Sequence, residues 1–199
     1  MHVQYAVVTS VTRDDLLDGG ASFFAETIER IRELSPQTLV EVLIPDLQGN
    51  WEALAFILAA RPAVLNHNME TVPRLYPTVR PQAGYELSLS LLAECKRRDP
   101  AMVTKSGIMV GLGEGRREIE TVMDDLLEVG CDILTIGQYL QPSKNHLPVV
   151  DFVAPEVFVE LEGVARKKGF PGVASSPMVR SSYEAGEIYR QVTESRGQA

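Results

Sequence analysis

The chain has 199 residues, of which 45% are hydrophobic, and this is enough to bury one substantial core. Its 27 acidic and 19 basic residues give a formal net charge of -8, so the sequence predicts no general attraction for nucleic acid or for an anionic membrane. Since the apolar runs are short and no basic, apolar leader opens the chain, we expect one cytoplasmic domain spanning residues 1–199.

Short apolar runs of β character alternate along the chain with longer segments of helical period, and no low-complexity linker separates them. Six of these runs are predicted to be strands of a parallel sheet, apolar throughout because both faces are buried. In chain order they span residues 2–9, 39–44, 63–66, 107–112, 132–136 and 173–175.

Between these runs, apolar residues recur at helical spacing and predict helices that cover the sheet. The three clearest stripes are Phe24, Ile28, Ile31 and Leu34; Leu54, Ile57 and Leu58; and Ile119, Val122, Met123 and Leu126. Gly130 is predicted to end the third helix. Repeated βα units of this kind fit an open doubly wound sheet or a complete or partial barrel.

Polar residues gather at or just after the carboxyl ends of the predicted strands. They are Thr9 and Ser10, Asp46, residues 66–70, residues 111–114, Gln138 and Tyr139, and Ser175 and Ser176. In a parallel barrel these ends form one rim, so the pattern favours a barrel with a cavity there. Loops that are polar because they contact water are the alternative.

The two cysteines, Cys95 and Cys131, are expected on separate helices, and neither has a second cysteine at metal-ligand spacing. Structural thiols are therefore the favoured interpretation.

Several segments resemble lipoyl synthase, a family of the radical S-adenosylmethionine superfamily. They include VVTSVTRDDLLDGGA, EVLIPDLQGN, TKSGIMVGLGE and ILTIGQYLQPSKNHLPV, together with HNMET at residues 67–71 and RSSY at residues 180–183. The resemblance implies an α/β fold, a partial parallel (βα) barrel that lacks its first strand. It also implies a sulfurtransferase that inserts two sulfur atoms into the octanoyl chain of a lipoyl carrier protein or domain.

The same resemblance implies S-adenosylmethionine, two 4Fe–4S clusters and an electron donor such as ferredoxin or flavodoxin. The family's two cysteine motifs, CxxxxCxxxxxC and CxxxCxxC, are absent from this sequence. We therefore expect an N-terminally truncated piece that is not competent for catalysis by itself, and we assign no catalytic residue.

Site residues follow from the resemblance, position by position. The residues expected to bind the cofactor are Thr9, Asp18, Gly19, Gly20, Asn68, Glu70, Lys105, Gly111 and Gln138. Those expected to bind the substrate are Arg74, Arg80 and Tyr139. Ser182 is expected to be the oxygen ligand of the auxiliary cluster.

Each assignment has a structural alternative. Residues 18–20 fit an ordinary turn into a helix, and the two arginines fit surface ion pairs. For His67, which is not among these assignments, a hydrogen-bonded structural role is favoured. Ser181 or Ser182 fits a helix cap. At the level of function, the alternatives are a non-catalytic fragment that binds S-adenosylmethionine or the carrier protein, and a barrel aldolase or isomerase that uses Lys105 or Glu114.

Overall fold

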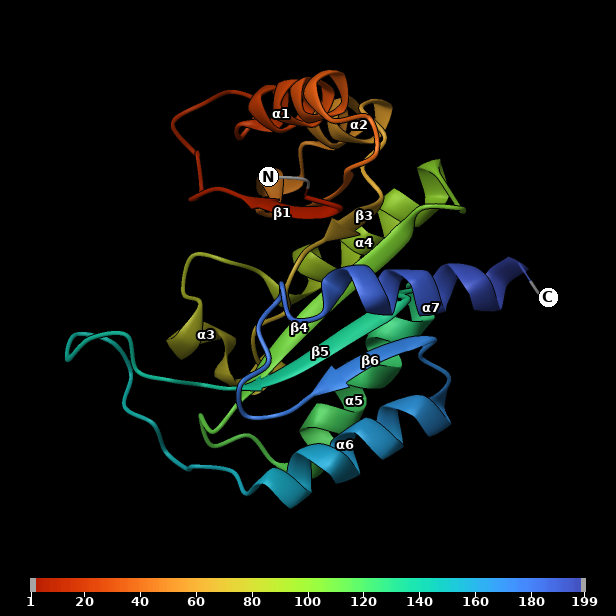
Figure 1. Cartoon of the computed structure of the whole chain (residues 1–199). Coiled ribbons are helices and arrows are strands. Elements are labelled where there is room, and N and C mark those ends of the chain that lie inside the picture. The colour runs from red at the N-terminus through yellow and green to blue at the C-terminus, as the bar shows by residue number, and fades with distance from the viewer. Residues whose placement is uncertain (1–2, 198–199) are drawn as a thin grey trace.

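The structure is a computed structural model that describes residues 3–197, and its centre is one sheet of six parallel strands (Figure 1). The strands are β1 (Tyr5–Thr9), β2 (Leu39–Leu43), β3 (Val64–Asn66), β4 (Val103–Val110), β5 (Ile133–Gln138) and β6 (Gly172–Ser175), paired in the order β1-β2-β3-β4-β5-β6. All six predicted strands are confirmed, although residue 2 of the first one lies outside the described residues.

Helices connect the strands, and most of them cover the convex face of the sheet. They are α1 (Ala21–Leu34), α2 (Trp51–Ala59), α3 (Tyr76–Val79), α4 (Tyr85–Arg98), α5 (Arg116–Glu128), α6 (Pro155–Lys168) and α7 (Ala185–Gly197), with short 3-10 turns η1 (Leu47–Gly49) and η2 (Pro73–Leu75). The three predicted helices are α1, α2 and α5, but Leu34 is 72% exposed and does not belong to the buried stripe of α1. Among residues 3–197, no helix combines the length and hydropathy of a membrane crossing.

The sheet curves around α7, which packs inside it (Figure 1). A Cβ placed on Gly186 would lie 3.2 Å from Tyr5 in β1, and one placed on Gly172 in β6 would lie 2.9 Å from Ile188. In a flat sheet these edge strands would lie roughly 24 Å apart, five strand spacings. One turn of α7 contacts both, so the sheet forms a partial barrel and α7 fills its interior.

The prediction of uniformly apolar strands was wrong on the concave face of the sheet. Glu41, Asn66 and Lys105 are buried there on β2, β3 and β4, and they contact one another. Strand β4 begins at Val103, four residues before the predicted start, because its first polar residues have partners on neighbouring strands and loops and do not form a loop themselves. Buried polar groups are tolerated where they are hydrogen-bonded.

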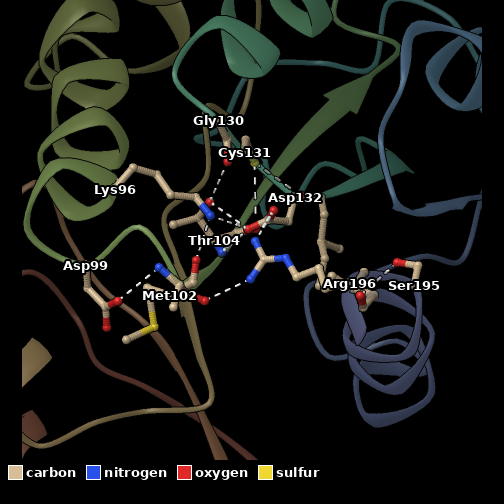
Figure 2. Close-up of polar contacts among 12 residues, drawn as sticks. Lys96, Asp99, Met102, Thr104, Gly130, Cys131, Asp132, Ser195 and Arg196 are labelled. Atoms are coloured by element: carbon tan, nitrogen blue, oxygen red, sulfur yellow. Dashed lines mark hydrogen bonds and ion pairs between the residues drawn. The ribbon is translucent and has the colours of Figure 1, made fainter. Parts of the chain in front are cut away.

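Asp132 anchors the C-terminal helix at the amino end of β5, as Figure 2 shows. Its carboxylate accepts hydrogen bonds from Lys96 Nζ at 2.7 Å and from the Thr104 backbone N–H at 2.8 Å, and it pairs with Arg196 of α7. Arg196 also donates to the Ala101 carbonyl at 2.8 Å. The chain therefore fixes α7 by polar contacts at this end and by apolar packing along its length.

Replacing Asp132 by alanine is expected to lower the free energy of unfolding by about 2 kcal/mol, because two cations and a backbone donor lose their partner. Urea unfolding measures the change. The matched control is Asp124→Ala, which removes an exposed carboxylate that pairs with Lys168, and it should cost less than about 1 kcal/mol. Equal effects of the two substitutions would contradict the anchoring role of Asp132.

Candidate functional site

A cavity of about 690 Å³ lies at the carboxyl ends of β1, β2 and β3. Its wall includes Thr9, Asp14, Asp46, Asn68, Glu70 and Arg80. Its size falls within the usual range of small-molecule sites. The predicted convergence of loops at one rim is therefore confirmed for the loops that follow the first three strands.

A second cavity, of about 190 Å³, lies beside the first at the carboxyl ends of β4 and β5. Asn68 and Glu70 line both cavities and so form the wall between them. Gly107, Gly137 and Ser181 line the second cavity from the other sides. The two hollows thus form one polar site divided by the residues that follow β3.

Glu70 holds a strained position in this dividing wall. Its φ is 66°, in the left-handed region, and its backbone pairs with β4 through Gly107 and Met109 at 2.9 and 2.8 Å. Burial raises the pKa of the Glu70 carboxyl, while Asn68 and Arg80 act in the opposite direction. Left-handed backbone in a residue other than glycine gathers at functional sites, so this geometry supports the predicted binding role.

Asn68 links the two halves of the site. Its Nδ2 donates to Glu70 Oε1 and to Ser181 Oγ, both at 3.1 Å, and its backbone carbonyl accepts from Arg80 at 3.0 Å. Its Oδ1 is buried and has no hydrogen-bond partner among the described residues. A buried acceptor without a partner is costly, so a donor from a bound ligand would stabilise this position.

His67 makes the contacts of a structural histidine, the role that the sequence favoured for it. Its ring is buried, Nδ1 donates to the Ile44 carbonyl at 2.9 Å, and Nε2 lies 3.0 Å from Ser88 Oγ. The carbonyl fixes the proton on Nδ1, so Nε2 accepts from the serine hydroxyl. Burial lowers the pKa of His67 to about 4, and the neutral ring is therefore the stable form at neutral pH.

The lowered pKa of His67 predicts acid sensitivity. In the unfolded chain a histidine has a pKa of about 6.5, so the unfolded state binds a proton first and stability falls as the pH drops below that value. Between about pH 7.5 and about pH 5 this group should cost roughly 2 kcal/mol. Urea unfolding across this range, with His67→Gln as the reference, measures the contribution. An unchanged pH dependence in that variant would contradict it.

The loop after β1 is ordered by its own contacts. Asp18 accepts hydrogen bonds from the backbone N–H groups of Gly20 and Ser22 at 3.0 and 2.9 Å, at the start of α1. A hydrogen bond with the Ser22 side chain, followed by these two backbone bonds, lowers the pKa of Asp18. Gly19 and Gly20 have φ of 59° and 86°, values that favour glycine. Asp18 thus occupies the turn that the alternative described, and its cofactor contact stays a prediction.

Four other predicted positions are held by structural contacts. Arg74 is more than half exposed and pairs with Glu118 at 2.8 Å. Gln138 fastens the loop of residues 140–153 through Asp151 and Val153, each at 3.0 Å, and Gly111 leaves room for it. Tyr139 donates to the Leu147 carbonyl at 2.8 Å. Apart from Gln138, which lines the second cavity, these four residues do not line either cavity.

Lys105 and the two serines complete the predicted set. Lys105 is 1% exposed and pairs with Glu41 at 2.9 Å, so its ammonium lies inside the barrel and is blocked from acting as a free amine. Ser182 is exposed and lines a hollow beside Tyr5 and Val7 on β1. Within the described residues, no side-chain hydrogen bond from either serine caps α7; Ser181 instead contacts Asn68.

Sequence reasoning missed Glu41, the centre of the buried network. Tyr5 Oη donates to its Oε2 at 2.8 Å, and Asn66 Nδ2 donates to its Oε1 at 3.0 Å. Burial, followed by the Glu41 charge, raises the pKa of Tyr5. The signal was present as a lone acidic residue inside an otherwise apolar strand, which requires a partner on a neighbouring strand.

The described residues do not fit an iron–sulfur cluster. Within residues 3–197, no group of three or more His, Cys, Asp or Glu side chains is placed to hold a metal ion. Burial raises the pKa of both thiols to about 12. The predicted placement of Cys131 on a helix was wrong, since it lies in the turn before β5. Both cysteines are buried structural thiols, as predicted.

The fold and the site together define a parallel βα protein of barrel type with a polar cavity at the carboxyl ends of its strands. Two solved structures share the fold. Methylornithine synthase (PylB) matches with a TM-score of 0.60 and 11% identity over 98% of this chain and 68% of its own. An aldolase matches with a TM-score of 0.51 and 13% identity over 96% of this chain and 85% of its own.

Curated relatives identify the family, although no family model matches the chain. The lipoyl synthases of Desulfotalea psychrophila and Caldicellulosiruptor saccharolyticus are 60% and 57% identical over 95% and 94% of this chain. That of Alkaliphilus metalliredigens is 54% identical over 93%. The chain belongs to the lipoyl synthase family, and it spans 63–66% of the length of these three relatives.

Proposed function

We propose that this chain forms the S-adenosylmethionine-binding part of a lipoyl synthase. In the complete reaction, two sulfur atoms are inserted into an octanoyl chain carried by a lipoyl carrier protein or domain. The observation that carries this proposal is the polar cavity built around Asn68 and Glu70, in a chain 54–60% identical to curated lipoyl synthases. A cytoplasmic location and a ferredoxin or flavodoxin as electron donor belong to the same proposal.

The lining of the larger cavity fits S-adenosylmethionine chemically. This molecule carries a sulfonium, an ammonium, an amine and hydroxyl groups, all of which favour acceptors or negative charge. Asp14, Asp46 and Glu70 supply carboxylates, and Asn68 supplies the buried Oδ1 that has no partner within residues 3–197. Arg80, on the same wall, offers donors suited to the ligand's carboxylate.

Each residue then has a role that its contacts support. Glu70 and Asn68 would accept from the ligand's donors, and Arg80 would hold its carboxylate while fixing Asn68 through the backbone carbonyl. Thr9 lies on the same wall and would add a hydroxyl contact. S-adenosylmethionine supplies the radical chemistry when bound in such enzymes. The described residues do not fit the clusters, so no step through them is assigned to this chain.

Titration of the 199-residue protein with S-adenosylmethionine, without iron, tests the proposal. Asn68→Ala and Glu70→Gln should each weaken binding about 10-fold to 100-fold, because each removes a buried hydrogen bond to a charged or polar group. Isothermal titration calorimetry measures both.

Glu128→Gln is the matched control, because Glu128 is an exposed carboxylate at the end of α5, and it should leave the affinity unchanged. If the unaltered protein binds S-adenosylmethionine, and Asn68→Ala and Glu70→Gln bind it as tightly as Glu128→Gln does, the ligand does not occupy the cavity beside Asn68.

A further inference from the structure

Residues 180–183, the RSSY segment, lie across the concave face of the sheet between the cavities and α7. Two polar contacts tie this segment to the sheet within the described residues. Lys105 Nζ donates to the Ser181 carbonyl, and Asn68 Nδ2 donates to Ser181 Oγ at 3.1 Å. The other backbone bonds of the segment are local, such as that from Tyr183 to Arg180 at 2.8 Å.

The ammonium of Lys105 has two partners. It forms an ion pair with Glu41, at 2.9 Å from Oε1 and 3.3 Å from Oε2, and it donates a hydrogen bond to the Ser181 carbonyl. Both side chains of the ion pair are buried, at 1% and 0% exposure. The ammonium is therefore held between the Glu41 carboxylate and the Ser181 carbonyl.

A buried ion pair is a poor source of stability, because desolvation offsets most of the attraction and apolar residues would fill the same space. What an apolar pair would lack is the donor to Ser181. Glu41 is itself held by Tyr5 and Asn66, at 2.8 and 3.0 Å, so the ammonium has a fixed position relative to β1, β2 and β3.

We propose that Lys105 is a positioning residue: held by Glu41, it fixes the Ser181 carbonyl and thereby sets the RSSY segment against the two cavities and Ser182 against the edge of β1. The significance of this placement for catalysis rests on the proposed function. The placement itself is a property of this chain and is measured without any ligand.

Trypsin cleavage after Arg180 reports the opening of the RSSY segment directly, because Arg180 is exposed and belongs to it. Cleavage after Lys144, in the exposed loop of residues 140–153, is the internal reference. In the double variant Lys105→Met with Glu41→Leu, the rate of cleavage after Arg180 divided by the rate after Lys144 should rise by about tenfold or more. This is the effect expected from losing one charge-assisted hydrogen bond. The urea midpoint should fall to some extent, because Tyr5 Oη and Asn66 Nδ2 lose their acceptor, so the readout is the cleavage ratio of the folded variant.

Tyr5→Phe is the matched control. It removes a donor from the same carboxylate but leaves the Ser181 contact in place, so the cleavage ratio should stay within about twofold of the unaltered value. A second neutral pair, Lys105→Gln with Glu41→Gln, shortens the donor arm and should open the segment in the same way.

An unchanged cleavage ratio in either folded double variant would overturn the proposal. Loss of the folded state in both double variants would also overturn it, because the Lys105–Glu41 pair would then stabilise the sheet as a whole and not the RSSY segment. These outcomes are separate from S-adenosylmethionine binding, so the proposed function is tested independently.

Discussion

Replacing Lys105 alone by methionine is expected to lower the free energy of unfolding by about 3–5 kcal/mol, the largest effect of any substitution considered for this protein. The Glu41 carboxylate would remain buried with Tyr5 and Asn66 as its partners but without a cation. An uncompensated buried charge is far more costly than the loss of the whole pair. Urea unfolding at neutral pH measures the difference.

Lys168→Met provides the comparison for this substitution, because Lys168 pairs with Asp124 at the surface, where that carboxylate is 59% exposed. It should cost less than about 1 kcal/mol. If Lys105→Met is as mild as Lys168→Met, the Glu41 carboxylate is not buried as the structure shows it.

The second large effect is expected for Gly137→Ala in β5. A Cβ at this position would lie 2.4 Å from the Val179 carbonyl oxygen, a backbone atom that has no free rotation to avoid it. The chain just before the RSSY segment would have to leave the sheet. We expect a loss of at least about 3 kcal/mol, at the upper end of overpacking effects, measured by urea unfolding.

Gly163→Ala is the matched control for this substitution. Gly163 lies in α6, and a Cβ there would meet nothing within 4 Å. Since alanine favours the helix, this variant should gain about 0.5–1 kcal/mol. A similar gain in Gly137→Ala would show that residues 176–179 do not lie on β5.

The strand and helix order was predictable because the apolar periodicity of this chain is regular. The polar start of β4 was not, because Thr104, Lys105 and Ser106 find their partners on other strands and loops. Ser106 Oγ, for example, accepts from the Met69 backbone at 3.2 Å. Sequence order alone does not reveal such pairs.

The predicted site residues also differ in whether their polar groups have partners elsewhere in the chain. Asn68, Glu70 and Thr9 follow strand ends and line the cavity, as the rim argument requires. Gln138 also ends a strand and Arg74 lies in the turn η2 between β3 and α3, but Asp151 and Glu118 occupy their polar groups. Whether a polar side chain faces a ligand or a neighbouring loop depends on distant contacts, and these became visible only in the folded chain.

The proposed function is tested most directly by joining this chain to the part of the Desulfotalea psychrophila lipoyl synthase that lies outside the match. The chimera, the 199-residue chain and the intact relative are reconstituted with iron and sulfide without oxygen and supplied with S-adenosylmethionine, a reductant and an octanoylated peptide. Mass spectrometry then measures the lipoyl product. We predict product from the chimera and the relative, and none from the chain alone. A folded, iron-loaded chimera that yields no product beside an active relative would contradict the proposed role of this chain in lipoyl synthesis.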